Sequence, residues 1–589
     1  MPEEPRRPKR VLAALTRARR RQAPYDCRMP VRFLQMQSRH ARAALIAAFL
    51  LPPLWVAPTA AASWSAPERP TGCSAALAAA PAPSIVFPSA QPTVLSGPGT
   101  LLWTAPRGCF AGANAGEAFG ATLAGDIPGV GQPLGSDPAG LAEVSATAGT
   151  ATGQIVAVGS GAFTEGTTAG AFGAARPLGG PAAPVATSSA YLGDVAIASP
   201  VRAGAGWAIA VRVQRHYSES PMHARLVPVG ASPVEAVAAA MDYRAEVLLV
   251  WASGGTVYAR ELSPAGAPGP VRRLGNLTAE SPDLELQALV SDDGHAIVAW
   301  RSQSVAPGGA PTAPPTTTIE LSISSGGLSF SAPRVLERFR DLGGFVPPAG
   351  SLRLLRLSSE AVMIAWTGVD TRRYVVRASP VSLRRGAWAP VVISKGAPAS
   401  DAVLADLAAG PNAEAFAVWR TAPSSSNGAP DSQRWAIRAA RGHYAGQGEV
   451  SFAIPEPVAA PGPHGPPTVA VDPASGGALA AWVTLAGAGG VGRVEYALHA
   501  AAPPSASAGA AASAGAAGSA RAAAPARAAA PVGAAAPVTH TARPTTSHGG
   551  IALFVVLAVL AALALAGALL LAVPTVRGTC ARGGVDTPQ

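Results

Sequence analysis

The sequence contains few cysteines, few charges and almost no lysine. Four cysteines in 589 residues exclude a disulfide-dense scaffold and an all-cysteine zinc site in the central region. Charged residues make up 13% and hydrophobic residues 49%, so the chain is too apolar to be disordered throughout. Lys9 and Lys395 are the only lysines, and the basic residues are therefore nearly all arginine.

Recognisable catalytic motifs are also absent. The chain has no G-x-S-x-G and no H-E-x-x-H sequence. The stretch Gly487–Gly492 matches G-x-G-x-x-G, but the pattern after it predicts a strand and not the helix that a dinucleotide site needs. Outside the N-terminal region the histidines lack the paired spacing of metal ligands; they are His216, His223, His295, His443, His464, His499, His540 and His548. We therefore expect no cofactor and no metal, and we assign no catalytic residue.

The net charge of +11 is concentrated at the two ends of the chain. Residues 1–42 carry nine net positive charges and residues 503–589 carry four, whereas residues 63–502 carry a net charge of −2. A nucleic-acid-binding domain concentrates positive charge on its folded body. The distribution therefore predicts membrane targeting and no nucleic-acid partner.

The first 62 residues resemble a secretory signal. A basic segment ending at Arg42 precedes an apolar run over 43–51, and the stretch that follows ends in the small residues Ala60-Ala61-Ala62. This pattern predicts cleavage after Ala62. The alternative is an uncleaved anchor, although the apolar stretch is shorter than the ~20 residues of a spanning helix. The true start could be Met1, Met29 or Met36.

A second hydrophobic segment lies near the C-terminus. Ile551 to Val573 is an apolar run without charge, about 35 Å long as a helix and enough to cross a ~30 Å hydrocarbon core. Arg577 and Arg582 follow it, so the positive-inside rule places residues 575–589 in the cytoplasm and the body outside the cell. Residues 503–548, rich in Ala, Pro, Ser and Gly, predict a disordered stalk. We expect a single-pass membrane protein with a transmembrane helix within 549–574.

Cys73 and Cys109 are the only cysteines in the region that we expect to be exported. An oxidising compartment favours a disulfide between them. The alternative is two free, buried thiols. A bridge would brace residues 63–140, which show little strand pattern of their own.

Five apolar runs end in tryptophan, which indicates a repeat. They are Val247–Trp251, Ala296–Trp300, Val362–Trp366, Ala415–Trp419 and Ala478–Trp482. Two weaker copies, Gln154–Gly159 and Trp207–Arg212, bring the number to seven. A short apolar strand and a turn precede several runs, and two strands of mixed polarity follow. The pattern of each unit therefore predicts four short antiparallel strands.

The tryptophan strands are apolar at every position, which is typical of strands buried on both faces. Four-stranded sheets packed face to face around an axis form a β-propeller. We therefore predict an all-β fold over 141–502, a β-propeller of about seven blades, with six possible. The alternative, a stacked β-sandwich array, requires one wet face on every strand.

The repeat, with its apolar strand that ends in Trp and, in one unit, the segment Gly386-Ala-Trp388 before Val391-Val-Ile393, resembles propeller repeats of secreted or membrane-anchored proteins of high-GC bacteria. The resemblance covers about 140–502 and implies the architecture but no particular activity. The turn at Asp292-Asp293-Gly294 does not match the Asp-box register of sialidase-like propellers, and it offers few oxygens for calcium. It therefore predicts a solvated turn.

The last unit lacks a fourth strand, and an open sheet edge would leave backbone groups unpaired. We expect the N-terminal segment to supply this strand, with Ser84–Phe87 and Gly99–Trp103 as the candidates.

The sequence favours a cell-surface, non-catalytic binding module for an unknown protein or glycan ligand. The alternative is an exported hydrolase acting on envelope glycans, which clustered carboxylates at the mouth of the propeller would favour. A structural role in envelope assembly is a third possibility.

Overall fold

The computed structural model describes most of the central region of the chain. The described residues are 63–77, 81–87, 98–109, 115–124, 127–134, 141–149, 153–159, 161–167, 172–179, 184–190, 194–215, 223–277, 283–304, 314–326, 328–342, 345–348, 350–395, 400–425, 428–446, 448–486 and 491–500. The expected signal segment, stalk and transmembrane segment Ile551 to Val573 lie outside these residues. Within the described part of the chain, no helix has the length and apolar character that a membrane crossing requires.

The described residues form eight β-sheets, which we call blades I to VIII. Blade I contains β1 (Thr71–Gly72), β3 (Ser84–Val86), β4 (Thr100–Pro106), β5 (Gly116–Ala124), β6 (Ile127–Pro128) and β7 (Val130–Pro133), and a short 3-10 turn, η1 (Arg107–Cys109), follows β4. Blade II contains β8 (Ala146–Gly149), β9 (Gln154–Gly159), β10 (Ala162–Thr167) and β11 (Arg176–Pro177). Blade III contains β12 (Ala186–Ser189), β13 (Val195–Ala203), β14 (Gly206–Gln214) and β15 (Ala224–Gly230). Blade IV contains β16 (Val234–Met241), β17 (Val247–Ser253), β18 (Thr256–Leu262) and β19 (Arg272–Asn276).

The remaining blades are built in the same order. Blade V contains β20 (Glu285–Val290), β21 (Ala296–Ser304), β22 (Thr316–Ser324) and β23 (Arg334–Arg340). Blade VI contains β24 (Leu352–Arg356), β25 (Ala361–Asp370), β26 (Arg373–Ser382), β27 (Gly386–Ala387) and β28 (Val391–Val392). Blade VII contains β29 (Ser400–Ala409), β30 (Glu414–Pro423), β31 (Trp435–Gly446), β32 (Glu449–Phe452) and β33 (Glu456–Gly462). Blade VIII contains β34 (Thr468–Val471), β35 (Ala478–Leu485), β36 (Val491–His499) and β2 (Ala75–Leu77).

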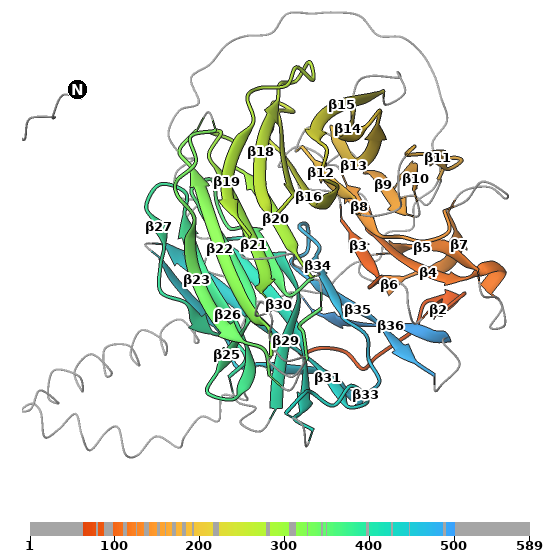
Figure 1. The fold of residues 1–589 in the computed structure, drawn as a ribbon. Coiled ribbons are helices and arrows are strands. Elements are labelled where there is room, and N and C mark those ends of the chain that lie inside the picture. The colour runs from red at the N-terminus through yellow and green to blue at the C-terminus, as the bar shows by residue number, and fades with distance from the viewer. Residues whose placement is uncertain are drawn as a thin grey trace, which may run out of the picture. The chain divides into compact units, whose positions relative to one another are not determined.

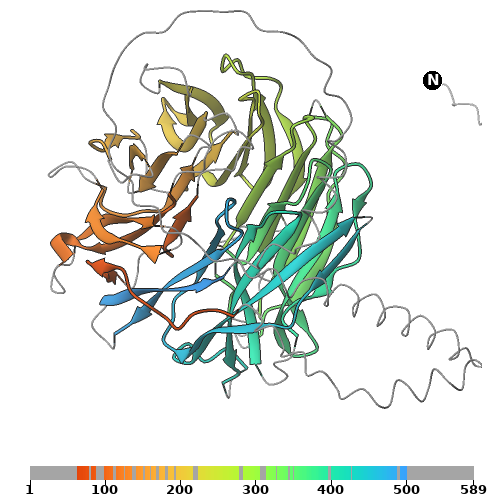
Figure 2. The same ribbon diagram turned by 180° about the vertical axis from the view of Figure 1, so that it is seen from behind.

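The blades form a closed ring. The first strands of neighbouring blades contact one another in the order β3, β8, β12, β16, β20, β24, β29 and β34, and β34 contacts β3 again. The sheets can be followed around this ring in Figures 1 and 2. The fold is therefore an eight-bladed β-propeller, so the prediction of a propeller is confirmed and the prediction of seven blades is wrong.

The second strand of most blades is buried on both faces, as the apolar runs predicted. Residues Val247–Ser253 of β17 are all buried, and β21, β25 and β30 are buried over most of their length. Continuous burial follows because each sheet packs between two others. The five predicted tryptophans lie in these strands and are at most 2% exposed: Trp251, Trp300, Trp366, Trp419 and Trp482.

Each of these tryptophans packs toward the preceding blade. Trp300 of blade V lies in a cluster with Leu248 and Val250 of blade IV, and Trp366 of blade VI lies with Ile297 of blade V. Trp251, Trp419 and Trp482 repeat this arrangement. The repeated tryptophan is thus the wedge between successive blades.

Blade I was not predicted from the sequence. Its second strand β4 contains Leu101-Leu102-Trp103, with Trp103 at the tryptophan position and 1% exposed. Trp103 packs toward blade VIII, as the wedge pattern requires. Its third strand β5 is rich in Gly and Ala, so the alternating pattern that marked the other units is absent. Residues 63–140, which we had placed outside the propeller, therefore contribute a complete blade.

The second weak repeat copy was also assigned to the wrong strand. Trp207–Arg212 belongs to β14, the third strand of blade III. The second strand is β13, where Ser199 and Pro200 occupy the end of the apolar run. Without the tryptophan, composition alone could not distinguish the two neighbouring apolar strands.

An N-terminal strand completes the last blade, as expected, but it is neither candidate strand. β2 pairs antiparallel with β36 through Ala75 and Arg493. Ser84–Phe87 and Gly99–Trp103 instead contribute the first two strands of blade I. β2 has only three residues, Ala-Ala-Leu, which is too short to give a periodic signal.

Residues 63–77, which we call the clasp, follow β36 along its length. The Glu68 amide donates to Tyr496 O at 2.8 Å and Tyr496 N donates back to Glu68 O at 2.9 Å. The Tyr496 hydroxyl reaches the Glu68 carboxylate at 3.0 Å. Trp103 Nε1 of blade I donates to Ala75 O at 3.2 Å, and a disulfide joins Cys73 to Cys109. The clasp therefore connects the last blade to the first.

Candidate functional site: networks and grooves at the two ends of the ring

The described histidines and carboxylates form no cluster suited to a metal ion. Polar side chains instead gather at two levels of the ring, one near the start of the first strands of blades V and VI and one beyond their ends. We call the first group the entrance network and the second the exit network. Both contain pairs of residues from adjacent blades that lie more than 50 positions apart in the sequence.

The entrance network is a chain of charged groups across four blades. Glu285 Oε1 of blade V accepts from Arg353 Nη1 of blade VI at 3.1 Å and from the Gly350 amide at 2.8 Å. Arg353 Nε pairs with Asp406 Oδ1 of blade VII at 3.1 Å. Asp406 Oδ2 then accepts from the Thr468 hydroxyl of blade VIII at 2.7 Å. The pairing holds the first strands of these blades together.

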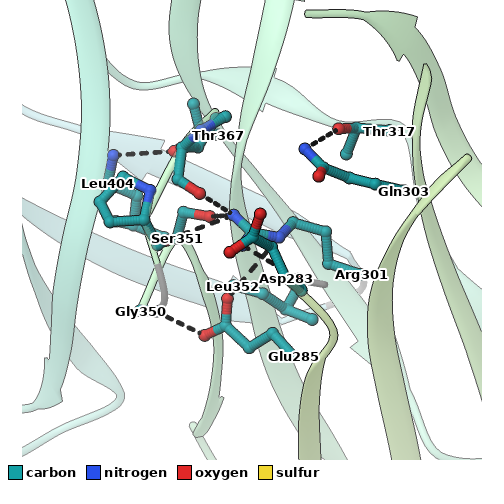
Figure 3. Close-up of polar contacts among 12 residues, drawn as sticks. Asp283, Glu285, Arg301, Gln303, Thr317, Gly350, Ser351, Leu352, Thr367 and Leu404 are labelled. Carbon is teal, nitrogen blue, oxygen red and sulfur yellow. Dashed lines mark hydrogen bonds and ion pairs between the residues drawn. The ribbon is translucent and has the colours of Figure 1, made fainter. Parts of the chain in front are cut away.

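Arg301 is a buried guanidinium beside this chain, and its side chain is directed toward the start of blade VI (Figure 3). It is 1% exposed. Nη1 donates to Pro347 O at 2.7 Å and also to the Ser351 hydroxyl. Nη2 donates to Asp283 O at 3.3 Å. Arg301 follows the wedge Trp300, and in the next blade Thr367 follows Trp366 and accepts from the Leu404 amide at 3.0 Å. The residue after the wedge thus ties these blades to the next.

Asp341 is the most perturbed carboxyl group of this region. It is 2% exposed, and Oδ2 accepts from the Thr317 hydroxyl at 2.9 Å and from Gln303 Nε2 at 3.0 Å. Burial raises the pKa of Asp341 to about 6, although these hydrogen bonds and Arg301 favour the charged form. The group therefore titrates near neutrality inside the fold.

Replacing Asp341 with Asn should stabilise the protein at alkaline pH relative to the parent. A raised folded-state pKa gives stability that is present below about pH 4 and is lost as the pH rises through about 6. Because Asn does not titrate, the free energy of unfolding of D341N minus that of the parent should grow by roughly 2 kcal/mol between pH 4 and pH 7.5, after allowance for solvent screening. Denaturant melts at the two pH values measure this difference.

The exposed Asp370→Asn substitution, in the same region of the ring, is the matched control for this charge loss. It should leave the difference constant within about 0.5 kcal/mol. A pH-independent difference for D341N would contradict the assignment of the titration to Asp341.

The exit network joins the turns of blades V and VI. Asp292 pairs through both oxygens with Arg356, with 3.0 Å between Asp292 Oδ1 and Arg356 Nη1. Arg384 lies 3.2 Å from Glu360 and 3.6 Å from Asp293. The turn at 292–294 was predicted as solvated, and its aspartates are indeed half-exposed, but these ion pairs could not be predicted from sequence.

Three hollows lie near the exit network. One, of about 510 Å³, runs along the first strands of blades III, IV and V and reaches Arg356. Its walls include consecutive residues such as Val237–Met241 and Leu286–Val290. Alternate residues of a strand point to opposite faces, so consecutive lining means that the backbone edges of the strands form the wall. This hollow is the central channel.

The second hollow, which we call the rim groove, has a volume of about 450 Å³ and lies between blades VI and VII. It is lined by Ser358, Ser359, Glu360, Ala361, Ser382, Arg384, Arg385, Trp388 and Tyr444. A third hollow of about 500 Å³, the side groove, lies between blades V and VI. It is lined by Leu321, Ile323, Ser325, Ser329, Phe330, Ser331, Ala332, Arg334, Leu383, Arg384, Gly386 and Ala387.

None of these groove residues was predicted from the sequence to be functional. The wedge tryptophans and the two cysteines are structural, and none lines a groove. Trp388 lies in the segment Gly386-Ala-Trp388 of the repeat, which the sequence predicts only to precede a fourth strand. The third-strand residue Tyr444 comes from another blade, so its proximity depends on the ring.

Comparison with known proteins does not assign a family. No protein-family profile matches the chain, and no curated protein matches it. Similar solved structures include a hypothetical selenium-binding protein from Sulfolobus tokodaii, with 8% identity, a TM-score of 0.38 and coverage of 65% of this chain and 93% of that one. A sialidase from Streptococcus pneumoniae has 8% identity, a TM-score of 0.29 and coverage of 71% and 68%. An α-L-arabinofuranosidase from Fusarium graminearum has 11% identity, a TM-score of 0.24 and coverage of 45% and 93%.

Proposed function

We propose that this protein is a cell-surface binding module, held by a single membrane helix, that recognises an extracellular ligand on its propeller without chemically changing it. The observation that carries the proposal is the engagement of the entrance carboxylates. Glu285 and Asp406 both pair with Arg353, and Asp406 also accepts hydrogen bonds from the next blade. Their negative charge is thus used to join blades.

A propeller glycosidase would need different carboxylates. Most glycoside hydrolases use two carboxyl groups that flank the bond, one to give a proton and one to attack or to activate water. Asp341 has a pKa suited to an acid, but it is 2% exposed and enclosed by Thr317 and Gln303. This enclosure supports binding over hydrolysis.

Screening of the purified full-length protein against envelope polysaccharides and surface-protein extracts tests the proposal. We expect saturable binding to a component, with no new reducing ends and no change in polymer length. Release of reducing ends that is abolished by Asp341→Asn or Glu285→Gln would overturn the binding assignment and favour the hydrolase.

The proposed location rests on the two hydrophobic segments of the sequence and has its own test. In intact cells, external protease should digest the propeller region and spare the tail that follows Val573. N-terminal sequencing of the membrane fraction should find Ser63 as the first residue. Complete protection of the propeller in intact cells would refute the location.

A further inference from the structure

We propose that the rim groove and the side groove together bind an acidic polysaccharide, a chain of sugars that carry carboxylates. The inference rests on the proposed binding function and names the ligand class. The chemistry of the two grooves combines aromatic rings, arginines and hydroxyl groups in a small area at the exit end of blades V to VII.

Trp388 provides a fixed aromatic surface in the rim groove. Its backbone is held on β26, because Trp388 N donates to Pro380 O at 3.1 Å and its carbonyl accepts from Ser379 Oγ at 2.7 Å. The indole lies directly against Gly448 of blade VII, where an added Cβ would be 2.4 Å from Nε1. With Tyr444 in the same groove, two aromatic residues can pack against the apolar faces of sugar rings.

The arginines of the rim groove favour ligands that carry negative charge. Arg385 is exposed, and its guanidinium pairs with no carboxylate among the described residues. Arg384 has a 58% exposed side chain and shares its charge between Glu360 and Asp293. A guanidinium matches a carboxylate with two parallel hydrogen bonds. Ligand carboxylates can therefore pair with Arg385 and compete for Arg384.

The two grooves favour a polymer over a single sugar. Both are lined by Arg384, and the turn Leu383–Ala387 separates them. Each has a volume within the ~300–1,000 Å³ range of ligand clefts. A ligand that crosses the turn can occupy both grooves and place successive carboxylates near Arg385, Arg384 and Arg334. Affinity should consequently rise with chain length.

A nucleic acid also offers anions and stacking rings, but the body of the chain opposes it. Residues 63–502 carry a net charge of −2, whereas a nucleic acid is bound through its phosphates by a strongly basic surface. Two aromatics and a few arginines within a neutral body suit a ligand whose sugar faces pack on the rings and whose carboxylates pair with arginines inside the grooves.

The test is titration calorimetry of the full-length protein with polygalacturonate, and with the same polymer after methyl esterification, which removes its charges. We expect the acidic polymer to bind at least tenfold more tightly than the ester, and a hexamer more tightly than a dimer. Arg385→Ala and Trp388→Ala should each weaken binding about tenfold or more. Arg372→Ala removes another exposed arginine, from the β25–β26 turn at the other end of blade VI, and this variant should bind as the parent does.

The possible results distinguish a failure of the acidic-polysaccharide proposal from a failure of the proposed binding function. Equal binding of polymer and ester, or no binding of polygalacturonate, overturns the acidic ligand class, while a ligand found in the surface screen would keep the binding function. Unchanged affinity in both groove variants overturns the site. Displacement of the polymer by single-stranded DNA at lower concentration would favour a nucleic acid and contradict the proposal. Melting temperatures of the variants within a few degrees of the parent exclude unfolding as the cause.

Discussion

Removal of the clasp, residues 63–77, is expected to unfold or aggregate the whole propeller. The clasp supplies the outermost strand of blade VIII, and its Cys73 is cross-linked to Cys109 of blade I by a disulfide. Its loss exposes the backbone edge of β36, removes the Glu68–Tyr496 hydrogen bonds and frees Trp103 Nε1. An open edge strand promotes association with other chains. Size-exclusion chromatography and thermal melts of the deletion variant measure the effect.

The double variant Cys73→Ser, Cys109→Ser is the graded comparison for this deletion. This variant keeps β2 but removes the cross-link. Its free energy of unfolding should fall by ~3–4 kcal/mol in the loop-entropy description, while the protein remains a monomer. A clasp deletion that stays monomeric and melts at the temperature of the parent would contradict closure by this segment.

Trp103→Ala should destabilise the protein by about 3–5 kcal/mol, the usual cost of truncating a buried tryptophan. Trp103 is 1% exposed and stacks on Phe119 with ring centroids 6.0 Å apart. It wedges blade I against blade VIII, so the cavity would open at the point where the ring closes. Denaturant unfolding followed by far-ultraviolet circular dichroism gives the free energy.

Trp207→Ala is the matched control, because Trp207 lies in the third strand of blade III and is only partly buried. Its loss should cost about 1 kcal/mol or less. Equal costs for the two substitutions would mean that Trp103 does not hold the wedge position and that blade I is not a repeat of the others.

The propeller could be predicted because a strand that is buried on both faces has apolar residues at consecutive positions, and this pattern can be recognised in the sequence. β17, β21 and β25 are apolar at every position up to the tryptophan, and the fixed place of that tryptophan allowed the repeats to be counted. Blade I has the same apolar run ending in tryptophan, at Trp103. Its third strand is rich in Gly, however, and lacks the alternating pattern by which the other units were recognised. β2 was invisible because three small residues have no period, and pairing with β36 across more than 400 positions depends on the closed ring.

The grooves could not be predicted for a related reason. Arg385 and Trp388 come from blade VI, while Tyr444 and Gly448 come from blade VII. Their distance in sequence gives no indication of contact, since the ring geometry alone brings the two turns together. The entrance network has the same origin: each of its charges has an ordinary position in its own strand and finds its partner one blade away.

Amide hydrogen exchange of the full-length protein, read by mass spectrometry on peptides that cover residues 63–77 and 491–499, tests the closed eight-bladed ring most directly. Amides paired in a cooperative core open only with the larger structure, whereas free chain exchanges rapidly. We predict that the Val494 and Tyr496 amides, which donate to Ser74 O and Glu68 O, exchange as slowly as those of β21. Exchange of both peptides at the rate of unstructured chain would contradict the account.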